Sequence, residues 1–258
     1  MSFLLRFLRI VAVLFWFLAL GACAALFMRR SWGCIKKVTG VTRLWGLGFT
    51  KILNIKVKVF GDPSSFKGGI IVSNHMGYLD ILVHGSLFPL RFTPKSDIAS
   101  WPLLGSYVGL SHPIWIDRRS KQKSQEALIS FRETMEHEIP LIVYPEGTSS
   151  DGKSGVLPFK STPFEAVVSS NFPILPILTI YNEPDGRPTS CWYGGMTLLP
   201  HVWTILGFRS IEVEVHILPP VHPEGRSRKE IAIFVHDIIE AEYKRVHAER
   251  LRSAESAV

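Results

Sequence analysis

The chain has 258 residues, of which 47% are hydrophobic and only 20% charged, and its mean hydropathy is +0.19. This composition excludes an intrinsically disordered chain, which would be poor in apolar residues and rich in charge. The length allows one or two domains with a real hydrophobic core, and the net charge of +7 indicates contact with a membrane or a nucleic acid.

Basic charge is concentrated in the first quarter of the chain. Ten lysine and arginine residues and no acidic residue precede Asp62, whereas the remainder carries 19 basic against 22 acidic residues. The same quarter contains an uncharged, mainly apolar run from Ile10 to Met28. Apolar runs flanked by basic residues are typical of proteins that meet a bilayer and its anionic surface. We expect a membrane surface as a partner and no nucleic acid, because basic and aromatic residues are not interleaved on a folded surface.

The apolar run at 10–28 is predicted to form a helix of roughly 29 Å, about the thickness of the bilayer core. A retained membrane anchor is favoured over a signal peptide or a lipoprotein that begins at Cys23, because the run continues past either cleavage site. A second, basic helix at 38–55 is interpreted as interfacial, with a core helix as the alternative. The basic residues that follow the first helix predict a cell-membrane location with the C-terminal side in the cytoplasm. The predicted division is an anchor at 1–58 and a second domain at 59–258.

Strand-like and helix-like segments alternate from residue 56 onward, which is typical of an α/β domain. We therefore expect a single α/β domain with a central mixed sheet flanked by helices, preceded by a membrane-binding helical segment. Continuous apolar runs predict buried strands, and alternation predicts a half-buried one near the C-terminus. The predicted strands are 57–59, 69–73, 113–117, 139–144, 174–181 and 211–217, and the predicted helices are 79–87, 124–138, 164–170 and 229–252.

Several kinds of reactive centre are not indicated. Cys23, Cys34 and Cys191 are odd in number and lack a CxxC spacing, which predicts neither a disulfide framework nor a metal site. There is no G-x-S-x-G elbow, Walker motif or dinucleotide fingerprint. We expect no metal and no other cofactor, and the expected nucleophile is a hydroxyl of the substrate.

A histidine and an aspartate follow directly on a predicted buried strand. His75 would lie on the loop and Asp80 in the first turn of the next helix, at a strand end where sites gather in α/β sheets. In that arrangement the carboxylate binds one ring nitrogen and leaves the other as a general base. The alternative is a capping or structural histidine.

Three further segments could contribute to a site. The turn at 146–152 is rich in glycine, serine and threonine, whose N–H groups and hydroxyls can hold an oxyanion or phosphate. Arg118 ends a predicted strand and could bind a phosphate through paired N–H donors. The apolar segment 172–177 could line an acyl-chain channel. The alternatives are an ordinary surface loop for the turn, a solvated charge for Arg118 and plain core for the apolar segment.

Taken in order, these segments resemble the four motifs of the glycerophospholipid acyltransferases, specifically the bacterial 1-acyl-sn-glycerol-3-phosphate acyltransferase (PlsC) family. The resemblance covers roughly residues 70–180, and Lys95 also matches a lysine that the family places near its acceptor site. The matching motifs are Asn74-His75-x4-Asp80, Trp115-Ile116-Asp117-Arg118, Pro145-Glu146-Gly147-Thr148 and Pro173-Ile174-Leu175-Pro176.

The resemblance implies an activity. His75, oriented by Asp80, would take the proton from the sn-2 hydroxyl of 1-acyl-sn-glycerol 3-phosphate. The alkoxide would attack the thioester of acyl-CoA or acyl carrier protein and give phosphatidate. The expected partners are therefore a membrane lipid acceptor and one of these acyl donors. The residues implied to bind substrate are Asn74, Lys95, Arg118, Glu146, Gly147, Thr148 and Ser149.

One position departs from the family pattern. The third motif often has an arginine where this chain has Ser149, and the loss of a cation keeps open a related acceptor such as a lyso-ornithine lipid, which has no phosphomonoester. Lys95 and Arg118 favour lysophosphatidate. A further alternative is a lipid-binding membrane protein without catalysis, against which the complete His75–Asp80 pair argues.

Overall fold

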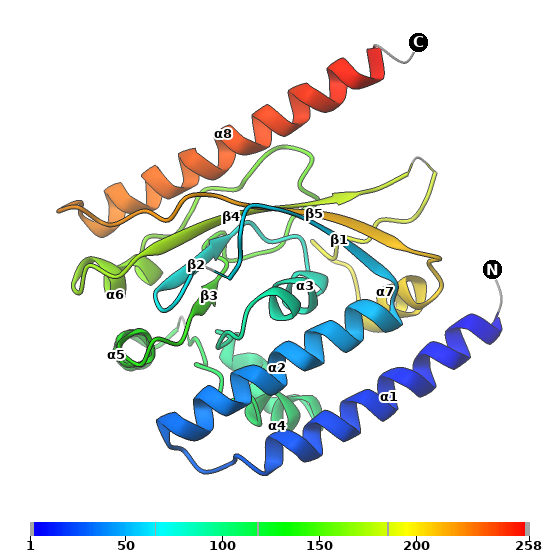
Figure 1. Cartoon of the computed structure of the whole chain (residues 1–258), viewed down its shortest axis with the longest axis horizontal. Coiled ribbons are helices and arrows are strands. Elements are labelled where there is room, and N and C mark those ends of the chain that lie inside the picture. The colour runs from blue at the N-terminus through cyan, green and yellow to red at the C-terminus, as the bar shows by residue number, and fades with distance from the viewer. Residues whose placement is uncertain (1–2, 65, 118, 185, 256–258) are drawn as a thin grey trace.

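A five-stranded mixed sheet forms the centre of the computed structural model, which describes residues 3–64, 66–117, 119–184 and 186–255 (Figure 1). The strand order is β1-β5-β4-β2-β3; β4 and β5 are antiparallel, and the other neighbours are parallel. Helices lie on both faces, which confirms the expected fold class. The strands are β1 (Ile55–Phe60), β2 (Ile70–Ser73), β3 (Leu141–Val143), β4 (Ile174–Asn182) and β5 (Ile211–Ile217).

The helices include several that the sequence did not predict. Among the described residues, the segments 96–100, 104–109 and 198–206 are helical without having been predicted, and 113–117 is extended but makes only an isolated bridge to Lys95. The α-helices are α1 (Phe3–Ala25), α2 (Trp32–Ile52), α3 (Leu79–Leu87), α4 (Leu104–Gly109), α5 (Lys121–Glu136), α6 (Glu165–Val168), α7 (Leu198–Leu206) and α8 (Arg228–Glu255), and the 3-10 helices are η1 (Ser96–Ser100) and η2 (Thr162–Phe164).

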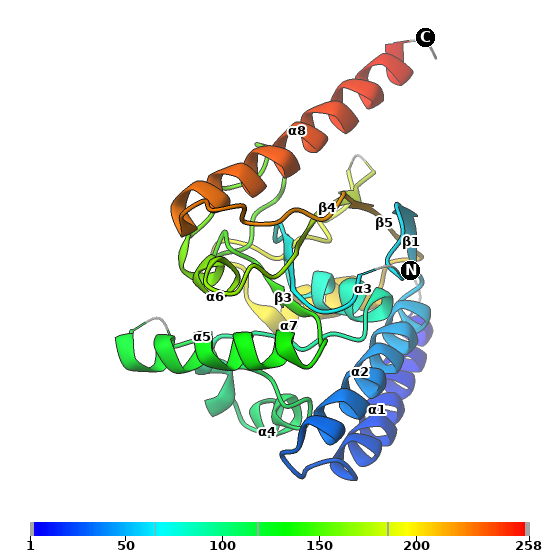
Figure 2. The same cartoon turned by 60° about the vertical axis from the view of Figure 1, so that its left-hand side comes forward.

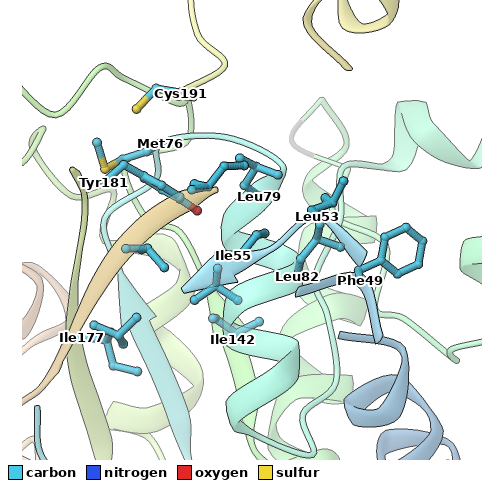
Figure 3. Packing of buried hydrophobic residues seen from close by; sticks show 14 of the residues in the cluster. Phe49, Leu53, Ile55, Met76, Leu79, Leu82, Ile142, Ile177, Tyr181 and Cys191 are labelled. Carbon is cyan, nitrogen blue, oxygen red and sulfur yellow. The ribbon is translucent and has the colours of Figure 1, made fainter. Parts of the chain in front are cut away.

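Two apolar cores sandwich the sheet. Ile71 of β2 faces a core built with α2, α3 and α7, whereas its neighbours Ile70 and Val72 face a core built with α5, α6 and α8. Figure 3 shows part of the first core, in which Phe49 of α2 and Leu53, which caps that helix, lie beside the sheet. All four residues of β2 are buried because helices cover both faces. The central strands β2 and β4 therefore begin with buried, continuous apolar runs, as the sequence predicted.

Helix α1 begins at Phe3 and ends at Ala25, earlier at both ends than the predicted 10–28. The two arginines near its start do not interrupt it, because Arg6 donates to the carbonyl of Trp203 and Arg9 to those of Leu206 and Phe208, at the end of α7. Among the described residues it is the one helix that is long and apolar enough to cross a membrane. Its exposed apolar stripe consists of Phe3, Leu4, Phe7, Leu8, Val11, Leu14, Phe15 and Leu18.

Helix α2 lies between α1 and the body of the domain (Figure 2). Two of its glycines, which weaken a helix in isolation, are sites of close approach: a Cβ at Gly46 would come within 2.5 Å of the backbone nitrogen of Ser86 in α3. At Gly48 the ring of Trp16 from α1 occupies the same position. The two N-terminal helices thus pack on the domain, and the predicted division at 58/59 falls within β1.

We predict that Gly46→Ala lowers the free energy of unfolding by about 1 to 3 kcal/mol, because the added methyl group overpacks the α2–α3 contact. Gly40→Ala is the matched control, since nothing lies within 4 Å of a Cβ at that exposed position of the same helix. The control should raise stability by up to about 1 kcal/mol through helix propensity. Chemical unfolding of both variants in detergent provides the measurement, and equal stabilities would contradict the close approach.

Candidate active site

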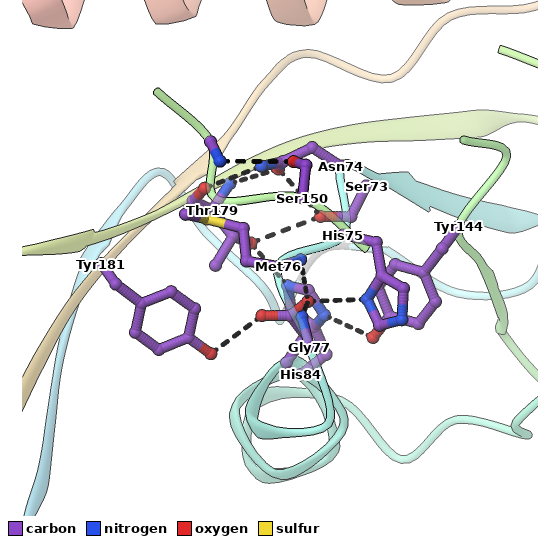
Figure 4. A network of polar contacts seen from close by, with 12 residues as sticks. Ser73, Asn74, His75, Met76, Gly77, His84, Tyr144, Ser150, Thr179 and Tyr181 are labelled. Atoms are coloured by element: carbon purple, nitrogen blue, oxygen red, sulfur yellow. Dashed lines mark hydrogen bonds and ion pairs between the residues drawn. The ribbon is translucent and has the colours of Figure 1, made fainter. Parts of the chain in front are cut away.

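His75 and Asp80 form a hydrogen-bonded pair at the carboxyl end of β2 (Figure 4). The Nδ1 atom of His75 lies 2.7 Å from Oδ2 of Asp80, which also accepts the backbone N–H groups of Met76 and Gly77 at 2.7 and 3.1 Å. His75 is on the loop and Asp80 in the first turn of α3, so the predicted placement of the pair is confirmed.

The electrostatics of the pair favour an ionised aspartate. Burial of Asp80 acts to raise its pKa, but the hydrogen bond and charge of His75 and the N–H of Met76 outweigh burial and lower it. A carboxylate on Nδ1 makes that nitrogen the donor and leaves Nε2 as the basic atom. The His75 side chain is 22% exposed, whereas that of Asp80 is fully buried. A group arriving from outside can therefore reach the histidine and not the aspartate.

The turn after β3 lies against the His75 loop. The ring of Tyr144 stacks on the imidazole of His75 with centroids 4.2 Å apart, and the N–H of Ser150 donates to the carbonyl of His75 at 2.9 Å. Because β2 and β3 are parallel, both loops leave the same edge of the sheet, where ligands bind in open α/β folds. Thr148 is exposed at this edge and Ser149 is partly exposed.

Glu146, in the same turn, is buried. One of its carboxylate oxygens accepts the N–H of Leu157 at 3.2 Å, and burial raises its pKa to about 8 despite the backbone N–H groups of Leu157 and His75. The side chain is therefore largely neutral at pH 7. Gly147 follows with a φ of +75°, in the left-handed region that favours glycine. These two residues shape the turn, and their contact with substrate stays a prediction.

Asn74 anchors the His75 loop to β4. Its carboxamide donates to the carbonyl of Thr179 at 2.9 Å and accepts the N–H of the same residue at 2.8 Å. The residue is only 5% exposed. These two hydrogen bonds to the backbone of Thr179 fix the start of the loop, while the expected substrate contact of Asn74 stays a prediction.

A recess of about 170 Å³ contains Lys95. The extended segment before Lys95 pairs in parallel with β3 through Arg91 and Leu141, and Lys95 itself bridges in parallel to Ile116. These segments therefore end at the same edge of the sheet as His75. Arg118, the other expected phosphate ligand, lies outside the described residues. The recess is lined by Lys95, Ser96, Asp97, Ile116, Asp117 and Arg119.

Comparison with known proteins places the chain in a family. The family model described as Acyltransferase matches residues 56–180. Over 190 residues the chain is 33% identical to the lyso-ornithine lipid O-acyltransferase of Rhodobacter capsulatus, a match that covers 70% of this chain and 67% of that protein. The chain belongs to the acyltransferase family.

Other relatives of this acyltransferase carry a different name. It is 26% identical to the 1-acyl-sn-glycerol-3-phosphate acyltransferase of Neisseria gonorrhoeae, over 71% of this chain and 72% of that protein. The crystal structure of the 1-acyl-sn-glycerophosphate acyltransferase from Thermotoga maritima, 22% identical, has the same fold, with a TM-score of 0.64 over 94% of this chain and 98% of that one. Both names denote acyltransferases that act on a lysolipid, and the acyltransferase family that the motifs predicted is confirmed.

The sequence did not predict some of the residues around the His75–Asp80 pair. Tyr181 donates to Asp80 at 2.8 Å, and His84 contacts both Tyr144 and Thr179 at 2.9 Å. The signal in the sequence was a polar residue at every second position, 179 and 181, within an otherwise apolar strand. Within the apolar segment 172–177, residues 174–177 are the buried start of β4, with Ile174 and Leu175 in the two cores, which favours its alternative as plain core.

We predict that Glu146→Gln gains stability relative to the wild type between about pH 5 and pH 8. A folded-state pKa near 8 lies above the usual value of 4.5, so the unfolded chain releases its proton first and wild-type stability falls as pH rises through this window. The difference should grow by about 3 to 4 kcal/mol between pH 5 and pH 8. Unfolding curves at several pH values measure it, with exposed Glu136→Gln as the control. A constant difference across this window would contradict a raised pKa.

Proposed function

We propose that this acyltransferase moves a fatty acyl group from an acyl thioester to the sn-2 hydroxyl of 1-acyl-sn-glycerol 3-phosphate. The observation that carries the proposal is the 2.7 Å contact between His75 and a buried, ionised Asp80 at an exposed sheet edge. A histidine held in this way has one free nitrogen and a carboxylate that stabilises the imidazolium.

The chemistry needs one base and one activated acyl group. Nε2 of His75 removes the proton of the acceptor hydroxyl as its oxygen attacks the thioester carbonyl. The tetrahedral intermediate then expels the thiolate, which takes the proton back from His75. The products are the acylated lipid and the free thiol of coenzyme A or of an acyl carrier protein, and His75 returns to its neutral form.

The acceptor assignment rests on the charges of the recess. Asp97 pairs with Arg119 at 3.1 Å, and Asp117 pairs with Lys123 at 3.2 Å. Among the described lining residues, Lys95 is the cation without an acidic partner, so it remains available for an anion. A phosphomonoester suits such a site, because an ammonium group acts on phosphate as a point charge.

A second acceptor is supported by Ser149 and by the relatives. Ser149 supplies no cation in the turn after β3, which weakens a site for a doubly charged phosphate. The relative from Rhodobacter capsulatus, at 33% identity, is named for lyso-ornithine lipid. Such a lipid carries one carboxylate and one ammonium group, and the paired acids and bases of the recess also suit a head group of both charges.

An acceptor panel separates these proposals. Purified wild-type protein, given an acyl-CoA or an acyl carrier protein thioester, should consume lysophosphatidate faster than lyso-ornithine lipid or other lysophospholipids. His75→Ala should lower transfer by about 10²- to 10⁴-fold, the usual contribution of a general base. Exposed His222→Ala is the matched control and should retain activity, because its ring contacts the carbonyl of Asn171 on the surface.

The outcomes of the panel are distinct. Preferred transfer to lyso-ornithine lipid would replace the first acceptor by the second and leave the class of reaction in place. Near-normal activity in a folded His75→Ala variant would contradict the general-base mechanism. Thioester binding without transfer to any lysolipid would favour the lipid-binding alternative.

We also propose that α1 lies along the membrane surface, with the domain on the cytoplasmic side. Its stripe of exposed apolar residues faces outward, and its opposite side packs on α2 and α7. Leu199 and Trp203 of α7 add exposed apolar area beside it. If α1 crossed the bilayer in this packing, the basic residues of α2 would enter hydrocarbon at considerable cost, whereas an interfacial α1 leaves them with the lipid headgroups.

This arrangement predicts that both ends of the chain lie on the same side of the membrane. Tags at the N-terminus and C-terminus should both be cleaved by protease added to inside-out membrane vesicles, and neither should be cleaved in intact cells. Protection of the N-terminal tag alone in the inside-out vesicles would instead indicate that α1 spans the bilayer. The C-terminal tag serves as the internal control for vesicle orientation.

A further inference from the structure

We propose that Tyr181 and the Tyr144–His84 pair are positioning residues that hold the His75–Asp80 base from two sides. This inference rests on the proposed function of that base. Tyr181 acts on the carboxylate oxygen that His75 does not use, and Tyr144 acts on the face of the His75 ring. The three residues come from β4, the turn after β3 and α3, and Figure 4 shows them around His75.

The first side is the hydroxyl of Tyr181. It donates to Oδ1 of Asp80 at 2.8 Å, whereas His75 and two backbone N–H groups share Oδ2. Tyr181 is 5% exposed, and its ring belongs to the core beneath α3, so the hydroxyl has no freedom to leave. The bond fixes the rotation of the carboxylate and stabilises its charge.

The second side is the ring of Tyr144. It stacks on His75 at 4.2 Å, and its hydroxyl contacts Nδ1 of His84 at 2.9 Å. His84 lies one helical turn after Asp80 on α3 and is fully buried, and its Nε2 contacts the hydroxyl of Thr179 at 2.9 Å. Both ring nitrogens of His84 therefore form hydrogen bonds. The one to Tyr144 fixes the orientation of the tyrosine ring that stacks on His75.

His84 is not a second base. Burial lowers its pKa to about 4, outweighing the attraction of Asp80, so the imidazole is neutral at the pH where His75 must act. Its contribution is therefore geometric.

Several titratable groups face Asp80 from the elements around it. Among the described residues they are His75, His84, Tyr144, Glu146, Tyr181 and Cys191.

Tyr181→Phe tests the first side, because it removes one hydroxyl and keeps the ring. Transfer should fall about tenfold in kcat, as expected for one hydrogen bond to a charged group, with KM changed less than about twofold. Without this donor the ionised carboxylate is less stabilised, so the pair holds its proton more tightly. The apparent pKa of the acid limb of the pH–rate profile should therefore rise by about half a unit or more.

Tyr144→Phe tests the second side and should lower kcat by a smaller factor, about threefold. The substitution keeps the ring that stacks on His75 and removes only the hydrogen bond of its hydroxyl to His84. The matched control is Tyr243→Phe on α8, which removes a tyrosine hydroxyl bonded to the carbonyl of Lys153, away from the pair. It should leave kcat, KM and the pH profile unchanged.

A second measurement needs no acceptor. NMR of labelled histidine in the purified protein reports the ring nitrogens of His75 directly, and Tyr181→Phe should shift their resonances while Tyr243→Phe does not. Unchanged kcat and unchanged His75 ring resonances in a folded Tyr181→Phe variant would overturn the proposal. A wild type that acylates no lysolipid would refute the proposed function alone, and the NMR shift would still decide the positioning role.

Discussion

An ionised carboxylate in the interior is the constraint around which this acyltransferase is arranged. Asp80 has no exposed surface, and an unpaired charge in such a place would cost several kcal/mol. Its two oxygens instead accept four hydrogen bonds, from His75, two backbone N–H groups and Tyr181. These donors come from the loop after β2 and from β4, so loop, helix and sheet must be in register before the charge is stable. The geometry of the His75–Asp80 pair and the folding of the domain therefore depend on the same contacts.

The parallel part of the sheet supplies the place for that charge. β4, β2 and β3 run in the same direction, so their loops leave one edge, and Asn74 ties the first of these loops to β4. Behind the site, Gly46 lets α2 approach the backbone of α3 closely, and α1 packs on α2 in turn. The helix that carries Asp80 is thus the innermost of three packed layers that lead outward to the exposed apolar stripe.

Local patterns predicted the parts of the fold that local physics determines. Three patterns lie within a few residues of the chain: the continuous apolar runs of β2 and β4, the alternation of β5, and the spacing of His75 and Asp80. Each of them predicts its strand or turn without knowledge of distant residues. Long-range contacts explain the failures: Arg6 and Arg9 looked like charges outside a helix, yet α7, two hundred residues later, supplies their acceptors. The same holds for the site, where only the folded chain reveals that Tyr181 reaches Asp80 and that the carboxylate of Glu146 turns inward.

The buried imidazole of His84 also imposes a direction on its neighbours. A neutral ring has one N–H and one lone pair, so it can donate to only one of the hydroxyls of Tyr144 and Thr179 and must accept from the other. The hydroxyl of Ser73, 3.3 Å from that of Thr179, extends the same row. The two hydrogen bonds of His84 therefore have two concerted orders, exchanged by a change of tautomer. The layer beside His75 is polarised through this ring, and reversing the role of the Tyr144 hydroxyl requires reversing that of Thr179.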